Sequence, residues 1–183
     1  MSQCSVVTLS GSLPRGVPVN IYGDLISIAK ERGVKTILNS SGEQFIKGLE
    51  KKPFLAKPDL RESNRVFGIK IDKEKDAINA AKEVVQRGAE IGIISLEQEK
   101  DIIATRDKIW FAETNYHEIV NLIGAGDALI AGFAIALTEE GKNLEEAIKF
   151  SMACALASAL REEEFSSREE VERCLQYVNV KTL

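Results

Sequence analysis

The segment LIGAGDALIAGF, residues 122–133, joins a turn of small residues to an apolar run that is typical of a buried helix. Asp127 stands where the turn meets that run, and an unpaired carboxylate is costly to bury. Small residues let an anion approach the free N–H groups of a helix's first turn, and a neighbouring Asp could accept a proton from an attacking hydroxyl. Phosphoryl transfer needs both elements. A tight turn with a helix-capping Asp is the alternative interpretation.

Two other phosphate-binding motifs do not fit the sequence. The Rossmann fingerprint G-x-G-x-x-G requires a third glycine where Leu129 stands. The Walker motif G-x-x-x-x-G-K-[ST] does not occur anywhere in the chain. The GAGD segment is therefore not explained by either of these common nucleotide-binding loops.

Composition excludes several classes of partner. The net charge is −4 without a basic cluster, which argues against nucleic acid as a partner. Apolar runs such as 128–137 are too short to span a bilayer, and the N-terminus lacks the pattern of a signal peptide. Cys4, Cys154 and Cys174 are typical of reduced thiols. We expect a cytoplasmic protein that binds neither nucleic acid nor membrane.

Strand-like and helix-like segments alternate along the chain, which predicts a mostly parallel sheet with helices on both faces, in three layers. We expect residues 1–183 to form a single α/β domain. His117 is interpreted as an ordinary residue before a strand, and Asn143 and Ser167 as helix caps. The predicted strands are 5–11, 34–38, 53–58 and 89–96, with a hairpin around 106–107. The predicted helices are 17–33, 41–50, 72–88, one that follows the GAGD motif and extends to about residue 140, 143–160 and a final helix.

In such sheets ligands bind at the carboxyl ends of the strands, in the loops that lead into helices. Five segments with chemistry-bearing or small residues fall at such positions, and we expect them to share one rim. They are Gly11-Ser12, residues 39–42, residues 57–59, Ser95 and residues 124–127.

Three motifs together resemble the PfkB/ribokinase family of sugar kinases: SGSLPRG at 10–16, KPDLRE at 57–62 and GAGD at 124–127. They are most similar to the branch that contains 1-phosphofructokinase and tagatose-6-phosphate kinase, and the resemblance extends from about Ser5 to the C-terminus. It implies a ribokinase-like fold and ATP-dependent phosphoryl transfer, with Mg²⁺, to a hydroxyl of a phosphorylated hexose.

The resemblance also implies roles within the GAGD motif. Asp127 matches the family's catalytic base, which takes the proton from the sugar hydroxyl. Gly124, Ala125 and Gly126 match the anion hole around the transferred phosphoryl group. These four residues would carry the chemical step.

The other matched positions concern binding. By resemblance, Lys57 lies near the nucleotide phosphates, Glu62 organises Mg²⁺, Ser12 lies near the phosphate of the sugar, and Ser95 ends a strand of the nucleotide site. Asp59 stands where the family has Asn. Outside the motif context, Lys57 and Glu62 could be a solvated surface pair, Ser12 an ordinary turn residue and Asp59 a cap.

The sequence departs from the family pattern after Ser95. Glu97 and Lys100 occupy glycine positions of the family's S-x-G-x-x-G loop. Together with Asp59, Glu97 would place carboxylates near the nucleotide phosphates, so we expect weak, Mg²⁺-dependent nucleotide binding.

The motif SGSLP falls near the middle of family members, after a G-G-x-x-N sugar-binding motif and a lid that this sequence does not contain. We therefore interpret the chain as a C-terminal part of a sugar kinase, truncated at the N-terminus and inactive by itself. A sheet edge left open would favour a homo-oligomer or a missing N-terminal part. The alternatives are a catalytically inactive remnant, or a different nucleotide- or phosphate-binding module.

Overall fold

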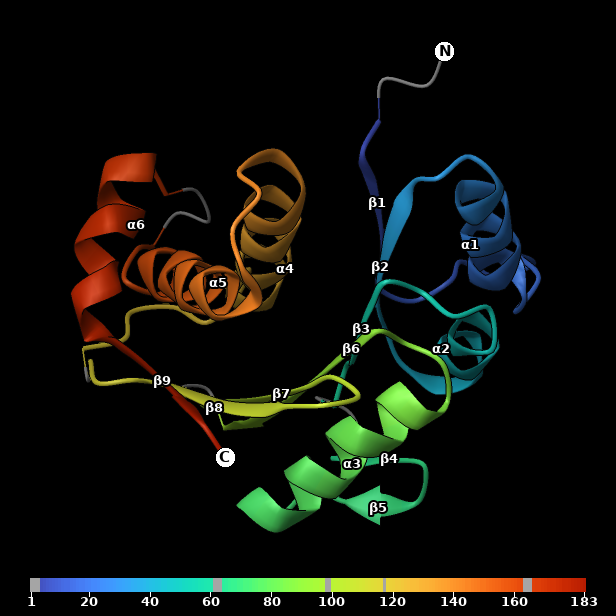
Figure 1. The fold of residues 1–183 in the computed structure, drawn as a ribbon, viewed down its shortest axis with the longest axis horizontal. Coiled ribbons are helices and arrows are strands. Elements are labelled where there is room, and N and C mark those ends of the chain that lie inside the picture. The colour runs from blue at the N-terminus through green and yellow to red at the C-terminus, as the bar shows by residue number, and fades with distance from the viewer. Residues whose placement is uncertain (1–3, 61–63, 98–99, 117, 163–165) are drawn as a thin grey trace. The chain divides into compact units, whose positions relative to one another are not determined.

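The computed structural model of the protein describes residues 4–60, 64–97, 100–116, 118–162 and 166–183. The chain folds as two compact units, residues 1–96 with 102–109 and residues 97–101 with 110–183. Seven strands follow the order β1-β2-β3-β6-β7-β8-β9 in one sheet (Figure 1). The strands are β1 (Val6–Ser10), β2 (Lys35–Ser40), β3 (Leu55–Pro58), β6 (Ile91–Glu97), β7 (Lys100–Ala104), β8 (Ile109–Thr114) and β9 (Val178–Thr182).

The predicted fold class is confirmed. β1, β2, β3 and β6 pair in parallel, and β8 pairs with β9 in the antiparallel sense, so the sheet is mostly parallel. Helices alternate with the parallel strands, as the sequence predicts. That residues 1–183 form a single domain stays a prediction.

In the first unit, helices pack on the parallel strands through glycines. Leu38, Ala56 and Gly92 are register partners on adjacent parallel strands, so their side-chain positions share one face. A Cβ at Gly48 would lie 2.8 Å from Leu38 Cδ2, and one at Gly92 would lie 2.7 Å from the Ala81 carbonyl. Two helices therefore cover this face closely. The unit's helices are α1 (Ile21–Glu31), α2 (Gly42–Leu49) and α3 (Glu74–Gln86).

A small antiparallel pair, β4 (Arg65–Val66) and β5 (Ile69–Lys70), was not predicted. Phe67 lies in the turn between these two strands, and its ring centroid is 6.3 Å from that of Phe45 on α2. The guanidinium of Arg87, at the end of α3, lies 4.3 Å from the centre of the same ring. This pair of short strands is therefore fixed by one aromatic side chain between two helices.

The second unit is mainly helical and also contains strand β9, which pairs with β8. A Cβ at Gly132 would lie 2.7 Å from Ser151 Cα, so the helices that contain them pack backbone to backbone. Asn143 and Ser167 accept from the N–H groups of Glu146 and Glu170, which confirms both predicted caps. The unit's helical segments are α4 (Ala125–Ala134), the π-helical η1 (Ile135–Glu139), α5 (Leu144–Ala159), α6 (Arg168–Cys174) and the 3-10 turn η2 (Leu175–Tyr177).

Three features of the second unit differ from the sequence prediction. Residues 118–122 have no regular structure, so the strand expected after His117 is absent there; His117 itself lies outside the described residues. The helix predicted to extend to about residue 140 changes to a π-helix at Ile135. The antiparallel strand β9 was not predicted, because its short alternating pattern gives no pairing partner by itself.

Two of the cysteines are buried in helices. Cys154 and Cys174 lie in α5 and α6, and burial raises the pKa of the Cys154 thiol to about 12. Within the described residues, no helix combines the length and apolar character needed to cross a membrane.

Candidate functional site

The ends of three parallel strands are joined by hydrogen bonds in the first unit. The Gly11 N–H donates to the Asn39 carbonyl at 2.9 Å, and the Ser40 hydroxyl donates to the Gly11 carbonyl at 2.6 Å. The Asp59 N–H donates to the Ser40 carbonyl at 2.8 Å. Three of the segments predicted to form a rim, after β1, β2 and β3, are therefore adjacent.

Tyr22 adds a fourth contribution to this rim. Its hydroxyl, carried by α1, lies 2.8 Å from the Ser10 carbonyl and 3.3 Å from the Gly11 carbonyl. Burial raises the pKa of Tyr22 above its ordinary value. Tyr22 lies in the predicted helix 17–33, and sequence reasoning gave it no role of its own; the signal that was available is its phenolic group.

The predicted binding residues of the first unit lie at or near the rim. Lys57 is half-buried on β3 in register with Asn39, and Ser12 is exposed in the turn after β1. Ser95 lies near the end of β6, which runs parallel to β3. Glu62 and the side chain of Glu97 fall outside the described part of the chain.

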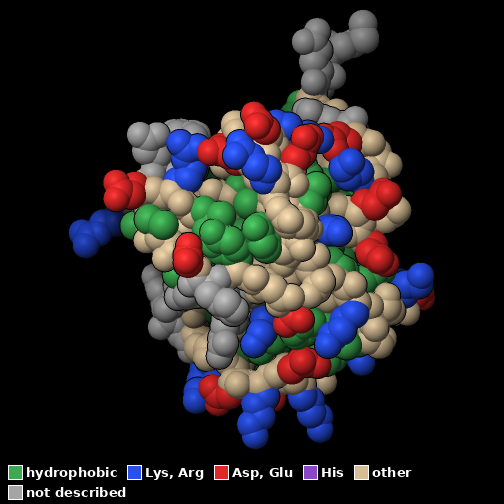
Figure 2. Space-filling model, turned by 90° about the vertical axis from the view of Figure 1, so that its left-hand side faces the viewer, with side chains coloured by type: hydrophobic (Ala, Val, Ile, Leu, Met, Phe, Trp, Pro, Cys, Tyr) green, Lys and Arg blue, Asp and Glu red, His purple; other side chains and the backbone are tan. Residues whose placement is uncertain are grey.

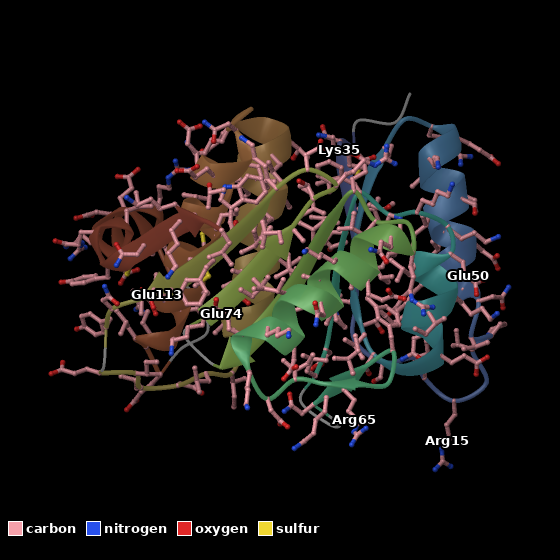
Figure 3. All side chains as sticks on the ribbon, turned by 60° about the horizontal axis from the view of Figure 1, so that its bottom comes forward. Arg15, Lys35, Glu50, Arg65, Glu74 and Glu113 are labelled. Carbon is pink, nitrogen blue, oxygen red and sulfur yellow. The ribbon has the colours of Figure 1, made fainter. Side chains whose placement is uncertain are left out.

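The surface around the rim's turn is open. Figure 3 shows Arg15, in the segment between β1 and α1, extending away from the ribbon. Ser12, Arg15 and Gly16 are all exposed. The turn after β1 is therefore accessible to solvent, while the strand ends next to it are held by part-buried hydrogen bonds.

The GAGD motif forms the start of α4 in the second unit. Gly124 has φ +83°, a left-handed conformation that favours glycine. The Ala125 N–H donates to the Leu122 carbonyl at 3.2 Å and the Ala128 N–H to the Gly124 carbonyl at 2.8 Å. Between them, the N–H groups of Gly126 and Asp127 have no acceptor within the described residues. These donors are available to an anion.

The surface at this helical turn is exposed at Gly126 and Asp127. A Cβ added at Gly126 would meet no protein atom within 4 Å, and the Asp127 side chain is exposed in the helix's first turn. The second unit thus presents two free backbone donors with a carboxylate on the same helical turn. The predicted anion hole was Gly124, Ala125 and Gly126, and of these the Ala125 N–H is already bonded to Leu122. The roles of these residues and of Asp127 as the base stay predictions.

The loop before the motif is tied to the end of α5. The N–H groups of Val120 and Asn121 both donate to the Ala159 carbonyl, at 2.9 Å and 3.0 Å. The Asn121 side-chain carbonyl accepts from the Ile123 N–H at 3.0 Å. Sequence reasoning missed Asn121, although an Asn three residues before the glycine of a turn is a recognisable local signal.

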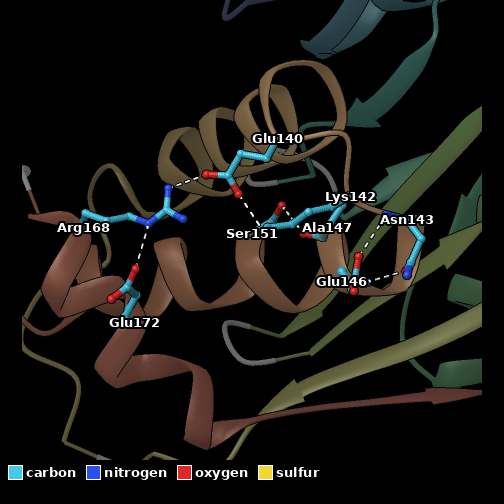
Figure 4. Close-up of polar contacts among 8 residues, drawn as sticks. All are labelled: Glu140, Lys142, Asn143, Glu146, Ala147, Ser151, Arg168 and Glu172. Carbon is cyan, nitrogen blue, oxygen red and sulfur yellow. Dashed lines mark hydrogen bonds and ion pairs between the residues drawn. The ribbon is translucent and has the colours of Figure 1, made fainter.

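Ion pairs between side chains hold the end of the helical segment that starts with α4 and continues through η1 (Figure 4). Arg168 donates to the Glu140 and Glu172 carboxylates and lies 4.8 Å from the centre of the Phe150 ring. Lys142 Nζ lies 2.9 Å from the Glu140 carboxylate. The hydrogen bonds from Arg168 and then Lys142 lower the pKa of Glu140. α6 is thereby attached to the segment that follows α4.

The five predicted loops fall in both units. Those after β1, β2 and β3 are brought together in the first unit, and the GAGD turn belongs to the second. That all five share one rim stays a prediction. Among the residues that the structure describes, no three His, Cys, Asp or Glu side chains gather as metal ligands.

Figure 2 shows Lys, Arg, Asp and Glu side chains interspersed over one face of the molecule. No broad area of positive charge is visible on that face. The interspersed charges agree with the absence of a basic cluster in the sequence.

Comparison with known proteins places the chain in a family. The family model described as "pfkB family carbohydrate kinase" matches residues 1–170. The chain is 32% identical over all 183 residues to 1-phosphofructokinase of Bacillus subtilis, of which it covers 60%. It is 35% identical over 159 residues to 1-phosphofructokinase of Borreliella burgdorferi, covering 86% of this chain and 51% of that protein.

Solved structures give the same result. A possible 1-phosphofructokinase of Thermotoga maritima superposes with a TM-score of 0.89 at 29% identity, covering 98% of this chain and 57% of that one. Phosphofructokinase-2 of Escherichia coli, in complex with substrates and products, superposes with a TM-score of 0.83 at 26% identity, covering 94% of this chain and 56% of that one. The chain therefore spans between about half and three fifths of the length of these relatives. It belongs to the pfkB family of carbohydrate kinases.

Proposed function

We propose that this chain carries the nucleotide-binding and catalytic-base part of a kinase that transfers the γ-phosphoryl group of ATP to a hydroxyl of a phosphorylated hexose. The start of α4 carries this proposal. Within the described residues, the N–H groups of Gly126 and Asp127 have no acceptor, and they belong to the same exposed helical turn as the Asp127 carboxylate, in a chain of the pfkB family. Charge neutralisation and proton acceptance are the two tasks of phosphoryl transfer.

In the proposed reaction, the Asp127 carboxylate accepts the proton of the sugar hydroxyl as that oxygen attacks phosphorus. The bond from phosphorus to the bridging oxygen breaks, and ADP leaves with the electron pair. The N–H groups at the start of α4 donate to the negatively charged oxygens of the transferred group. The helix dipole adds to this stabilisation, because the N-terminal end of a helix carries partial positive charge. Ala125 shapes the turn between its two glycines.

The remaining roles follow the family motifs. Lys57 and Ser95 bind the nucleotide side, and Ser12 binds the phosphate of the sugar. Mg²⁺, when bound to ATP, neutralises phosphate charge and needs only one or two protein carboxylates. Asp59 is the described carboxylate that fits this task, with Glu62 as the second.

The names of the relatives support a fructose phosphate as the acceptor. Bacillus subtilis and Borreliella burgdorferi relatives are named 1-phosphofructokinase, and one Escherichia coli neighbour is in complex with fructose-6-phosphate. Another form of that neighbour is tetrameric. We therefore include self-association in the proposal.

The test replaces Asp127 by Asn in an active form of the protein. That form is a chimera of this chain with the part of the Bacillus subtilis relative that it does not match, assayed by ADP release with fructose 1-phosphate and fructose 6-phosphate. We expect Asp127→Asn to lower kcat by about 10²–10⁴-fold, because a general base is lost. The dissociation constant for ATP should stay nearly unchanged.

Glu145→Gln is the matched control, since Glu145 is also an exposed carboxylate in the first turn of a helix. It should keep full turnover. Near-normal turnover of Asp127→Asn would remove this residue from the mechanism. A chimera that binds ATP yet shows no turnover with either sugar would favour a non-catalytic binding module.

A further inference from the structure

Two buried hydroxyl groups from different elements meet at the Gly11 carbonyl. Ser40 on β2 is fully buried, and Tyr22 on α1 is 9% exposed. The Ser40 hydroxyl donates to the Gly11 carbonyl at 2.6 Å, and the Tyr22 hydroxyl lies 2.8 Å from the Ser10 carbonyl and 3.3 Å from that of Gly11. Neither side chain reaches the exposed surface where a substrate would bind.

The turn that they hold has little other support. Gly11 has φ +85°, and a Cβ there would meet no atom within 4 Å, so packing does not fix its position. Ser12 and residues 14–16 are exposed. Hydrogen bonds to the backbone of Ser10 and Gly11 are therefore the main restraint on where Ser12 lies.

Ser40 also joins this turn to the end of β3. Its hydroxyl donates to Gly11, and its backbone carbonyl accepts from the Asp59 N–H at 2.8 Å. One residue thus sets the spacing between the turn that carries Ser12 and the loop that carries Asp59. Under the proposed function, these two loops bind the sugar phosphate and the nucleotide with its metal.

We propose that Tyr22 and Ser40 are positioning residues for the phosphorylated substrate. Their hydroxyls fix the carbonyls of the Ser10–Gly11 backbone, and so hold Ser12 where the phosphate of the hexose binds. The ligand side of this inference rests on the proposed function. The hydrogen-bonded turn itself is a property of the fold, and the experiment separates the two.

A tyrosine and a serine with satisfied hydroxyls can also be ordinary core residues. In that case, removing either hydroxyl lowers stability without a selective change in substrate affinity. A positioning role requires weaker binding of the sugar phosphate with unchanged binding of ATP. Affinity for the two ligands, measured on the same variants, therefore distinguishes the roles.

The experiment compares Tyr22→Phe and Ser40→Ala with two matched controls. Ser27→Ala removes a hydroxyl that donates to the Gly23 carbonyl within α1, and Tyr177→Phe removes a phenolic hydroxyl in the other unit. The first measurement is hydrogen exchange at the Gly11 amide by NMR on the full chain without ligand. The second is the affinity for fructose 1-phosphate, fructose 6-phosphate and ATP, by calorimetry on the full chain and on the chimera.

We expect exchange at the Gly11 amide to be about 5-fold faster in each test variant, because one buried hydrogen bond is lost. Affinity for the hexose phosphate that binds should fall by about 5-fold as well, with ATP affinity nearly unchanged. Both controls should resemble the wild type in both measurements. In the double variant Tyr22→Phe/Ser40→Ala, the two losses should not add, since both hydroxyls restrain one segment.

Unchanged exchange at Gly11 in both variants would overturn the inference, whatever the ligands do. Faster exchange with equal losses for sugar phosphate and ATP would also overturn it, because the role would then be structural only. If neither hexose phosphate binds to the wild-type chain or to the chimera, the proposed function fails. Faster exchange confined to the test variants would then still support the restraint of the turn.

Discussion

Two glycine turns of this molecule have nearly the same backbone conformation and opposite hydrogen bonding. Gly11, after β1, has φ +85°, and Gly124, before α4, has φ +83°. At Gly11 the N–H and the carbonyl are both bonded, to Asn39 and Ser40. After Gly124, the Ala125 N–H is bonded to the Leu122 carbonyl, but the following N–H groups of Gly126 and Asp127 have no acceptor within the described residues.

The difference separates two uses of the same residue type. A turn whose polar groups are satisfied internally is fixed in place and can position a neighbouring side chain. A turn whose N–H groups have no acceptor in the protein can bind an anion. The anion then supplies the missing acceptors, which offsets the free-energy cost of leaving these N–H groups unsatisfied. Left-handed glycine supplies the conformation in both cases, and the tertiary contacts decide its use.

The largest expected effect concerns the packing of α4 against α5. We call the Gly124 turn, at the start of α4, the open turn, and the Gly11 turn the closed turn. Gly132→Val would place a side chain where a Cβ already lies 2.7 Å from Ser151 Cα, so α4 must move away from α5. We expect a loss of about 3 kcal/mol in the free energy of unfolding by urea, from overpacking. Ala131→Val, on the exposed side of the same helix, is the control and should cost about 0.7 kcal/mol or less. Equal losses would mean that α4 is not fixed by this contact.

A smaller effect distinguishes the two glycines of the open turn. Gly124→Ala forces a side chain into the left-handed region and should cost about 1–2 kcal/mol of stability. Gly126→Ala faces open space and should keep stability, or raise it by up to about 1 kcal/mol through helix propensity. Because its methyl group meets only a ligand, Gly126→Ala should nevertheless weaken ATP binding in calorimetry. Unchanged ATP affinity would mean that the phosphates bind elsewhere.

The carboxylate of Asp59 lies in the loop that is hydrogen-bonded to Ser40, next to the closed turn at Gly11. Asp59 replaces the family's Asn and would repel nucleotide phosphates, so we expect ATP to bind weakly and more tightly with Mg²⁺. Asp59→Asn should strengthen ATP binding in chelator by about 5-fold, which corresponds to about 1 kcal/mol for two charges near 4 Å in water. Asp107→Asn, in the exposed turn between β7 and β8, should change nothing. Tighter wild-type binding in chelator than in Mg²⁺ would contradict this prediction.

The smallest effect tests the anchor at the far end of the α4 segment. The pKa of Glu140 is lowered by Arg168 and then Lys142, so its stabilisation is present above its ordinary pKa of 4.5 and is lost as pH falls through the lower folded value. Glu140→Gln should cost about 1 kcal/mol or less at pH 7. In urea unfolding as a function of pH, its difference from the wild type should shrink below pH 4.5. A difference that is constant with pH would show that this ion pair does not stabilise the fold.

The sequence by itself determined the features that depend on local pattern. The alternation of strands and helices, the caps at Asn143 and Ser167, and the start of a helix within GAGD follow from neighbouring residues. The motifs SGSLPRG, KPDLRE and GAGD also predicted the family, which the comparisons confirm. The roles of the residues in these motifs stay predictions.

Only the tertiary structure decided which distant groups meet. Tyr22 and Ser40 converge on Gly11 because α1 and β2 pack beside β1, and a stripe of apolar residues does not specify which carbonyl a buried hydroxyl reaches. Strand β9 exists through its antiparallel pairing with β8, which five alternating residues do not reveal. Hydrogen bonds between segments far apart in the sequence form only after the chain has paid for loop closure, so no local pattern encodes them.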